Sequence, residues 1–298
     1  MVDISINLAG IKMQNPVMVA SGTFGYGDEY AELMDINRLG ALVTKTITVL
    51  PRAGNPPLRI VETPAGMLNS IGLQNVGLQS FITDKLPKLR KLTIPIIVSI
   101  AGESIPEFIQ LAETLSAQPG IAGLEMNISC PNVAAGGMFF GIDAKLTNEV
   151  VTAVRKVTKL PVLVKLTPNV TDITVIGKSA EAAGAEVLVA INTLLGMAID
   201  IETGKPKLGN LVGGLSGPAI KPVAVRMVYE LAKKVKIPII GTGGIMTTED
   251  ALEFFYAGAK AVSIGTGIFV DSQIPLKIVD GLSEPRIAQI IANKVNLV

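Results

Sequence analysis

The 298-residue sequence contains no histidine, no tryptophan and only one cysteine, Cys130. One cysteine cannot form a disulfide within the chain, and it cannot supply the four thiolates of an iron–sulfur or zinc site. Without histidine, the commonest zinc ligand and the commonest general base at neutral pH are also missing. We therefore expect no metal site in this chain.

Long apolar runs and large blocks of one charge are missing as well. Hydrophobic residues make up 49% of the chain and the mean hydropathy is +0.50, but no 18 consecutive residues are apolar, so no membrane-spanning helix is expected. Met1-Val2-Asp3 does not begin a signal peptide, which predicts a cytoplasmic protein. The net charge is +1 and the only basic cluster is the small one at 85–91, which argues against nucleic-acid binding.

Proline and glycine alternate regularly along the sequence. Proline disfavours helix at the residue before it and suits the first position of a strand, whereas glycine readily takes the left-handed conformation that ends a helix. The distance from a proline that begins a strand to the next glycine that ends a helix is long enough for one strand, one helix and two short loops. Apolar runs follow Pro16, Pro95, Pro161 and Pro238, and further apolar runs follow Gly40, Gly120, Gly184 and Gly258.

Eight apolar, β-branched runs therefore alternate with helical segments, as in a parallel sheet covered on both faces. They predict an α/β fold, a (β/α)8 TIM barrel formed by residues 1–298 as one domain. Residues 4–8 and 11–13 predict a small N-terminal β-hairpin, and we expect inserted loops at the C-terminal face of the barrel. A doubly wound sheet is the alternative fold. The expected strands centre near Val19, Val43, Val98, Met126, Leu163, Val189, Ile240 and Val262.

Two glycine- and threonine-rich segments lie at the ends of the last two expected strands, where such barrels hold their chemistry. They are Gly241–Gly244 and Ile264–Gly267. Loops in these places commonly bind phosphate through backbone N–H groups. The two segments predict a phosphate-bearing ligand, and ordinary tight turns are the alternative.

Lysine and asparagine side chains are expected at the same end of the barrel. Lys45 and Lys165 each end an apolar strand, and a buried lysine without a partner is costly, so a negative ligand group would be the simplest partner. The alternative is a lysine whose ammonium reaches solvent. Amides both donate and accept hydrogen bonds, so several asparagines indicate a planar, amide-like substrate, although each could instead serve a turn or cap. The asparagines are Asn69, Asn127, Asn132 and Asn192.

Cys130 lies at the end of the fourth expected strand, within Asn127–Asn132, and precedes a charge-free loop, Pro131–Ile142. A free cysteine usually packs as a small hydrophobic residue. Its place beside the lysines, asparagines and phosphate loops instead favours a reacting thiol. We expect the loop to act as a lid that excludes water.

Together these motifs resemble those of the class 1 dihydroorotate dehydrogenases, and most closely those of the NAD-linked class 1B catalytic subunit. The resemblance covers essentially the whole chain, with the motifs in the right order. They are Ser21-Gly22-Thr23-Phe24-Gly25, Asn69-Ser70-Ile71-Gly72-Leu73, Asn127-Ile128-Ser129-Cys130-Pro131-Asn132, Ile191-Asn192-Thr193, Leu215-Ser216-Gly217-Pro218-Ala219 and Gly241-Thr242-Gly243-Gly244.

The resemblance implies an FMN-containing barrel that oxidises dihydroorotate to orotate in de novo pyrimidine (UMP) biosynthesis. Cys130 would take the proton from C5 of the substrate while a hydride passes from C6 to flavin N5. The implied substrate-binding residues are Lys45, Asn69, Ser70, Ile71, Gly72, Leu73, Asn127, Asn192 and Thr193. The implied FMN-binding residues are Ser21, Lys45, Thr46, Ser99, Asn127, Lys165, Ile191, Gly217, Gly243, Gly244, Gly265 and Thr266.

The resemblance also implies a route for the electrons. They would reach NAD through a separate subunit that carries FAD and a 2Fe–2S cluster, on a homodimer core within a heterotetramer. Ser99 departs from this pattern, because many class 1B chains have asparagine there and serine is more like the fumarate-linked class 1A enzymes. A fumarate-linked enzyme therefore stays an alternative.

Three further alternatives are two other barrel enzymes and a non-enzymatic binding module, which would give no reason for so many polar groups at one end of the barrel. A tRNA dihydrouridine synthase would need a basic face and an added RNA-binding segment, and the sequence shows neither. A non-redox sugar-phosphate lyase or isomerase would keep the phosphate loops and could use Lys165 for a Schiff base.

Overall fold

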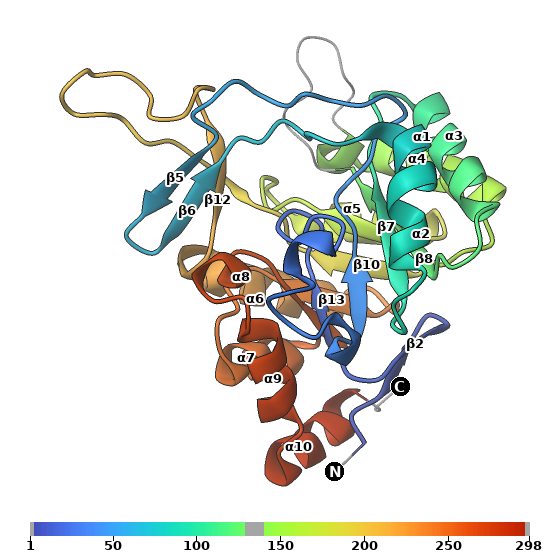
Figure 1. Cartoon of the computed structure of the whole chain (residues 1–298). Helices are drawn as coiled ribbons and strands as arrows, with labels where there is room; N and C mark the ends of the chain where they lie inside the picture. The colour runs from blue at the N-terminus through green and yellow to red at the C-terminus, as the bar shows by residue number, and fades with distance from the viewer. Residues whose placement is uncertain (1–2, 129–139, 296–298) are drawn as a thin grey trace.

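The computed structural model describes residues 3–128 and 140–295 (Figure 1). Eight parallel strands form a closed barrel, as the sequence predicted, and each expected strand centre falls within one of them. The last strand pairs with the first through Val262 and Val17, which excludes the doubly wound sheet. In barrel order the strands are β3 (Val17–Val19), β4 (Ala41–Val43), β7 (Ile96–Ile100), β8 (Gly123–Asn127), β9 (Val162–Leu166), β10 (Val187–Ala190), β13 (Ile239–Thr242) and β14 (Ala261–Ile264).

Helices connect most of the strands around the outside of the barrel. Among the described residues, no helix is both long enough and apolar enough to span a membrane. The helices are α1 (Gly77–Ser80), the π-helix η3 (Phe81–Lys85), α2 (Leu86–Leu89), α3 (Ile105–Ser116), the 3-10 helix η4 (Phe140–Ile142), α4 (Ala144–Val157), α5 (Ile173–Ala182), the 3-10 helix η5 (Pro218–Ile220), α6 (Lys221–Ala232), α7 (Thr248–Ala257), α8 (Gly267–Val270), α9 (Ile274–Leu282) and α10 (Pro285–Val295).

The connection from β3 to β4 differs from the predicted strand–helix unit. It contains two 3-10 turns, η1 (Asp28–Tyr30) and η2 (Ile36–Arg38), and no α-helix. Gly25 and Gly27 both have positive φ, which interrupts a helix, and the fully buried Phe24 anchors the segment.

Three of the four predicted helix-ending glycines take the expected conformation. Gly120, Gly184 and Gly258 have φ of 84°, 97° and 112°. Gly40 does not have a positive φ, so its predicted role was wrong. A Cβ atom at Gly40 would clash with the backbone oxygen of Asn15, so glycine there allows two backbone segments to approach closely.

Inserted loops were expected at the C-terminal face, and segments that follow β4 and β10 there form one four-stranded antiparallel sheet, which was not predicted from the sequence. Its central pairing joins β6 to β12, with Asn69 opposite Gly214. We call it the inserted sheet. In Figure 1 it lies at the opposite end of the molecule from β2. Its strands, in order, are β11 (Leu194–Gly196), β12 (Gly213–Ser216), β6 (Gly66–Asn69) and β5 (Ile60–Thr63).

The predicted N-terminal hairpin consists of β1 (Ile6–Leu8) and β2 (Ile11–Met13). Its buried residues Leu8, Ile11 and Met13 join an apolar cluster with inward-facing barrel residues. We call this cluster the closed end of the barrel. The barrel strands contribute Met18, Ala41, Val43, Ile97, Leu163, Val187, Val189, Ile240 and Ala261 to it.

Candidate active site

A pocket of about 270 Å³ lies at the carboxyl ends of the barrel strands. Successive side chains of a strand point to opposite faces, so residues two apart share a face. On β9, Leu163 belongs to the closed end, and Lys165 lines the pocket. The inward face of β4 changes in the same way between Val43 and Lys45. One two-residue step therefore separates the apolar core from the polar floor of the pocket.

Most of the residues predicted for the site are brought together in this pocket. Those in its lining are Ser21, Lys45, Thr46, Asn69, Ile71, Gly72, Leu73, Asn127, Lys165, Ile191, Asn192, Thr193, Gly217, Gly243, Gly244, Gly265 and Thr266. Cys130, Asn132 and almost all of the predicted lid lie outside the described residues, so their roles stay predictions.

Two predicted residues, Ser70 and Ser99, lie behind the lining instead of in it. Ser70 is fully buried, and its Oγ accepts a hydrogen bond from Asn55 Nδ2 at 2.8 Å. Ser99 is fully buried on β7, with its Oγ 2.9 Å from Thr46 Oγ1. Ser99 can therefore orient Thr46, which does line the pocket.

Lys165 places a buried ammonium group in the floor of the pocket. The residue is only 8% exposed, and its Nζ donates to Ser21 Oγ at 3.4 Å. Among the described residues, neither Lys165 nor Lys45 takes part in a salt bridge with a carboxylate. Because a buried cation is stabilised by an opposite charge, the two lysines suit an anionic ligand.

Lys45 is half-buried and follows β4 directly, and its backbone N–H donates to the carbonyl oxygen of Gly25 at 2.7 Å. Burial lowers the pKa of Lys45 below its ordinary value of 10.5, and the charge of Glu29 partly opposes that shift. Desolvation disfavours the charged form of a lysine, so a bound anion would offset part of the free-energy cost of burying the ammonium.

Three amide side chains reach the pocket from separate elements. Asn69 ends β6 in the inserted sheet, Asn127 ends β8, and Asn192 follows β10. Asn69 Nδ2 donates to the carbonyl oxygen of Gly214 at 3.2 Å, which ties the side chain to the neighbouring strand β12. Neutral donors and acceptors on several sides of one pocket can hold a planar ring that carries amide groups.

Glycines from three loops meet at another part of the pocket, which we call the glycine cradle. It consists of Gly217, Gly243–Ile245 and Gly265–Gly267. Gly244 has a φ of 74°, and a Cβ there would lie 2.8 Å from the carbonyl oxygen of Gly217, so only glycine fits without strain. Thr266 Oγ1 donates to Ser216 Oγ at 2.7 Å, which joins two of the loops. Such concave backbone can bind a phosphate group.

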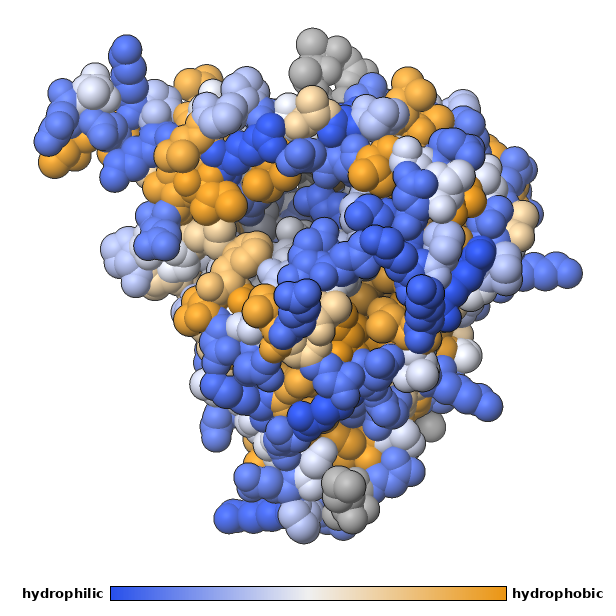
Figure 2. Space-filling model, viewed as in Figure 1, coloured by the Kyte–Doolittle hydropathy of each residue, from blue (hydrophilic) through white to orange (hydrophobic). Residues whose placement is uncertain are grey.

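The pocket also has an apolar rim that was not predicted from the sequence, formed by Ile60, Leu195, Val212 and Phe269. Their side chains are unusually exposed for large apolar groups, at 43% to 52%. In Figure 2, orange surface gathers around the part of the molecule that holds the inserted sheet. For Leu195 a signal was available, because large apolar residues recur at every second position from Leu195 to Ile201, which is the period of a strand.

Comparisons with known proteins agree in identifying one family. The family model described as dihydroorotate dehydrogenase matches residues 3–285. A protein of Geotalea uraniireducens (strain Rf4), named dihydroorotate dehydrogenase B (NAD(+)), catalytic subunit, is 54% identical over 94% of this chain and 92% of its own length. A protein of the same name from Thermoanaerobacter sp. (strain X514) is 53% identical over 95% of this chain and 93% of its own length.

A solved structure supports the fold. The chain resembles the dihydroorotate dehydrogenase of Eimeria tenella, solved in complex with ferulenol, with a TM-score of 0.80. The match covers 99% of this chain and 88% of that one at 20% identity, so it bears on the fold alone.

Proposed function

The chain belongs to the dihydroorotate dehydrogenase family, and on that premise we propose that it oxidises dihydroorotate to orotate as an NAD-linked catalytic subunit in pyrimidine biosynthesis. The observation that best supports this function is the set of residues that line one pocket. A glycine cradle, two lysines without carboxylate partners among the described residues and three asparagines line the same 270 Å³ space. Residues 1–298 would form one FMN-binding domain. The cytoplasmic location stays a prediction.

The pocket fits FMN as the cofactor. Gly217, Gly243, Gly244, Gly265 and Thr266 would hold its phosphate in a cradle that a Cβ at Gly244 would obstruct. When bound, FMN supplies the acceptor for the substrate's hydride. The ammonium of Lys165 would hold negative charge at the ring, and Ser21, Thr46 and Ile191 would contact it.

The other lining residues suit a substrate that carries a carboxylate and ring amides. Lys45 would bind the carboxylate, and Asn69, Asn127 and Asn192, with Thr193, would hold the ring. Ile71, Gly72 and Leu73 would form the adjoining wall. Cys130 would remove the proton from C5, acting through its thiolate, which is the basic form of the side chain.

A partner subunit is the final part of the proposal. The relatives are named as catalytic subunits of an NAD(+) enzyme, which supports a partner that carries electrons to NAD. FAD and a 2Fe–2S cluster would belong to that partner, on a homodimer core within a heterotetramer. The exposed apolar rim at the pocket mouth supports a protein contact there, because such patches commonly mark interaction sites.

The absorbance spectrum of the purified protein tests the cofactor and the substrate together. We expect a yellow protein with a flavin spectrum that dihydroorotate bleaches in the absence of oxygen. A colourless protein with an intact fold would instead favour a sugar-phosphate lyase or isomerase.

The electron acceptor needs a separate test. We expect dihydroorotate-dependent NAD⁺ reduction only after the iron–sulfur flavoprotein is added. Rapid NAD⁺ reduction by the chain alone would contradict the need for a partner, and rapid fumarate reduction by the chain alone would favour the class 1A alternative.

A further inference from the structure

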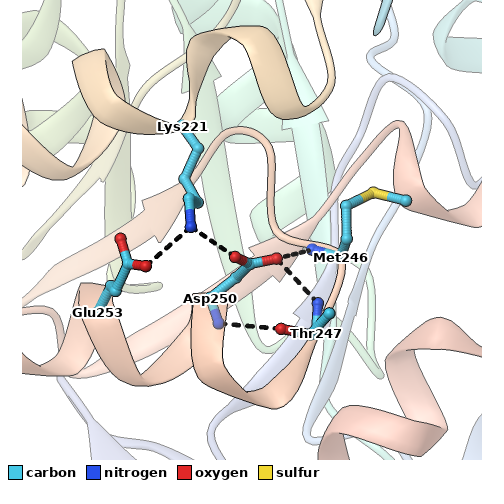
Figure 3. Close-up of polar contacts among 5 residues, drawn as sticks. All are labelled: Lys221, Met246, Thr247, Asp250 and Glu253. Atoms are coloured by element: carbon cyan, nitrogen blue, oxygen red, sulfur yellow. Dashed lines mark hydrogen bonds and ion pairs between the residues drawn. The ribbon is translucent and has the colours of Figure 1, made fainter. Parts of the chain in front are cut away.

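Lys221 joins two carboxylates outside the pocket lining (Figure 3). It is the first residue of α6, and its side chain is 23% exposed. Its Nζ lies 2.6 Å from Asp250 Oδ1 and 2.8 Å from Glu253 Oε1, both on α7. The ammonium therefore holds the start of α6 against α7.

Asp250 binds a second segment with its other oxygen. Oδ2 accepts the backbone N–H of Met246 at 2.9 Å and that of Thr247 at 3.0 Å. Thr247 Oγ1 in turn accepts the backbone N–H of Asp250, which completes a capping box at the start of α7. One carboxylate thus joins the loop after β13 to Lys221.

Both joined segments continue directly into the glycine cradle. Gly243–Ile245 immediately precede Met246, and Gly217 and Ile220, also in the lining, lie just before Lys221. The segments are in close contact, because a Cβ on Gly244 would lie 2.8 Å from Lys221 Cβ and 3.0 Å from its backbone nitrogen. The Lys221–Asp250 bridge therefore fixes two cradle loops from behind.

We propose that Lys221 and Asp250 are positioning residues for the phosphate of FMN, which hold the loops at 217–220 and 243–247 at the spacing that the phosphate needs. The proposal rests on FMN binding as proposed above. It deepens that function by assigning a role to two residues that do not line the pocket.

This cluster would not attract a phosphate through its charge. One ammonium faces two carboxylates, so the group does not offer a positive charge to a phosphate. The hydrogen bonds that Lys221 donates to Asp250 and Glu253 raise the pKa of Lys221. Burial alone would raise the pKa of Asp250, but hydrogen bonds from Lys221, Met246 and Thr247 lower it overall. Lys221 and Asp250 thus both stay charged and paired around neutral pH.

The phosphate group supplies the test, since riboflavin lacks it and FMN carries it. The full-length chain is freed of flavin and titrated with each ligand, and binding is followed by the change in flavin fluorescence. For Lys221→Met and for Asp250→Asn we expect the Kd for FMN to rise about tenfold, as for the loss of a charged hydrogen bond, with little change for riboflavin. Lys221→Arg should restore most of the FMN affinity, because it keeps the bridge.

Two control variants separate positioning from other effects. Glu253→Gln removes a carboxylate whose side chain is 51% exposed and should leave FMN binding near the wild-type value. Thr247→Val removes the side-chain acceptor of the capping box but keeps the backbone N–H that Asp250 binds. It should lower the Tm, yet keep the affinity for FMN.

The sign of the Asp250→Asn effect is decisive. If the cluster acted through its charge, removal of a carboxylate would tighten FMN binding, and that result would overturn the proposal. An equal loss for FMN and riboflavin, or unchanged FMN binding in Lys221→Met, would also overturn it. If the wild-type chain failed to bind FMN, the proposed function would fail first.

Discussion

The two ends of the barrel interior are built on the same strands but have opposite chemistry. At the closed end, the hairpin and the barrel strands pack a cluster of apolar side chains. One buried carboxylate, Glu125 on β8, lies opposite Leu163 of that cluster. At the pocket end, the same inward faces carry Lys45, Asn127 and Lys165. On β4 and β9, one two-residue step separates a residue that contributes to the apolar core from one that lines the pocket. A substitution at one end should therefore leave the other end nearly unaffected.

The largest effect should come from the thiol assigned to the pocket end. Cys130→Ala is expected to retain flavin but to lower turnover with dihydroorotate by about 10² to 10⁴, the usual contribution of a positioned base. Steady-state kinetics together with the flavin absorbance would measure both effects. Full turnover in this variant at neutral pH would remove Cys130 from the mechanism.

A matched truncation at the closed end should affect stability alone. Leu163 is fully buried, and Leu163→Ala should lower the free energy of unfolding by about 2 to 5 kcal/mol through lost burial and a residual cavity. Chemical denaturation would measure the loss. The flavin bound per folded molecule should stay unchanged, and a large drop in it would show that the two ends are coupled.

The matching substitution at the pocket end is at Lys165, two residues after Leu163 on β9. Lys165→Met should weaken flavin binding about tenfold or more, because it removes a buried ammonium without a carboxylate partner among the described residues. The flavin-free protein should unfold at the same denaturant concentration as the wild type, or at a higher one, since a buried charge is costly. Unchanged flavin content and unchanged reduction would contradict the role of Lys165.

The pH dependence of substrate binding should reveal Lys45. Burial lowers the pKa of Lys45. The side chain is therefore charged at low pH, and as the pH rises it loses its charge before the pH reaches the ordinary pKa value of 10.5. The KM for dihydroorotate should therefore increase on the alkaline side. Glu29 raises the pKa of Lys45, so Glu29→Gln should move this increase to lower pH. An identical alkaline profile in Lys45→Met would assign the increase to another group.

The smallest effect should come from the surface. Arg226 and Glu230 form an ion pair one turn apart on α6, and their side chains are 53% and 39% exposed. Glu230→Gln should change the free energy of unfolding by less than about 0.5 kcal/mol, and both flavin content and turnover should stay unchanged. A larger change would show that this helix face is more tightly coupled to the barrel than its exposure implies.

The barrel could be predicted because its signals are local in the sequence. Pro95, Pro161 and Pro238 come directly before β7, β9 and β13, and β-branched runs form the strands that follow. The inserted sheet depends instead on pairing between residues far apart, such as Asn69 and Gly214, which local patterns do not reveal. The 3-10 turns after β3 were missed because an interval length does not specify which kind of helix fills it.

The position of the site could be predicted, but not which side chains line the pocket and which lie behind the lining. Counting to strand ends placed Lys45, Asn127 and Lys165 at the pocket, because the carboxyl ends of parallel strands meet at one face. The same counting could not show that Ser99 lies behind Thr46, since that depends on how deep each inward side chain sits. The Lys221–Asp250 bridge was also beyond reach, because it joins two helices through tertiary packing.

The pairing of β14 with β3 has a consequence for synthesis of the protein. Val262 must reach Val17 before the barrel can close, and the third loop of the glycine cradle, Gly265–Gly267, follows at once. A growing chain that emerges from the ribosome N-terminus first would therefore have to be made through Gly267 before it could hold a flavin phosphate. Cofactor loading would then require that the chain has been translated and folded through Gly267, and a product truncated before this third loop would stay colourless.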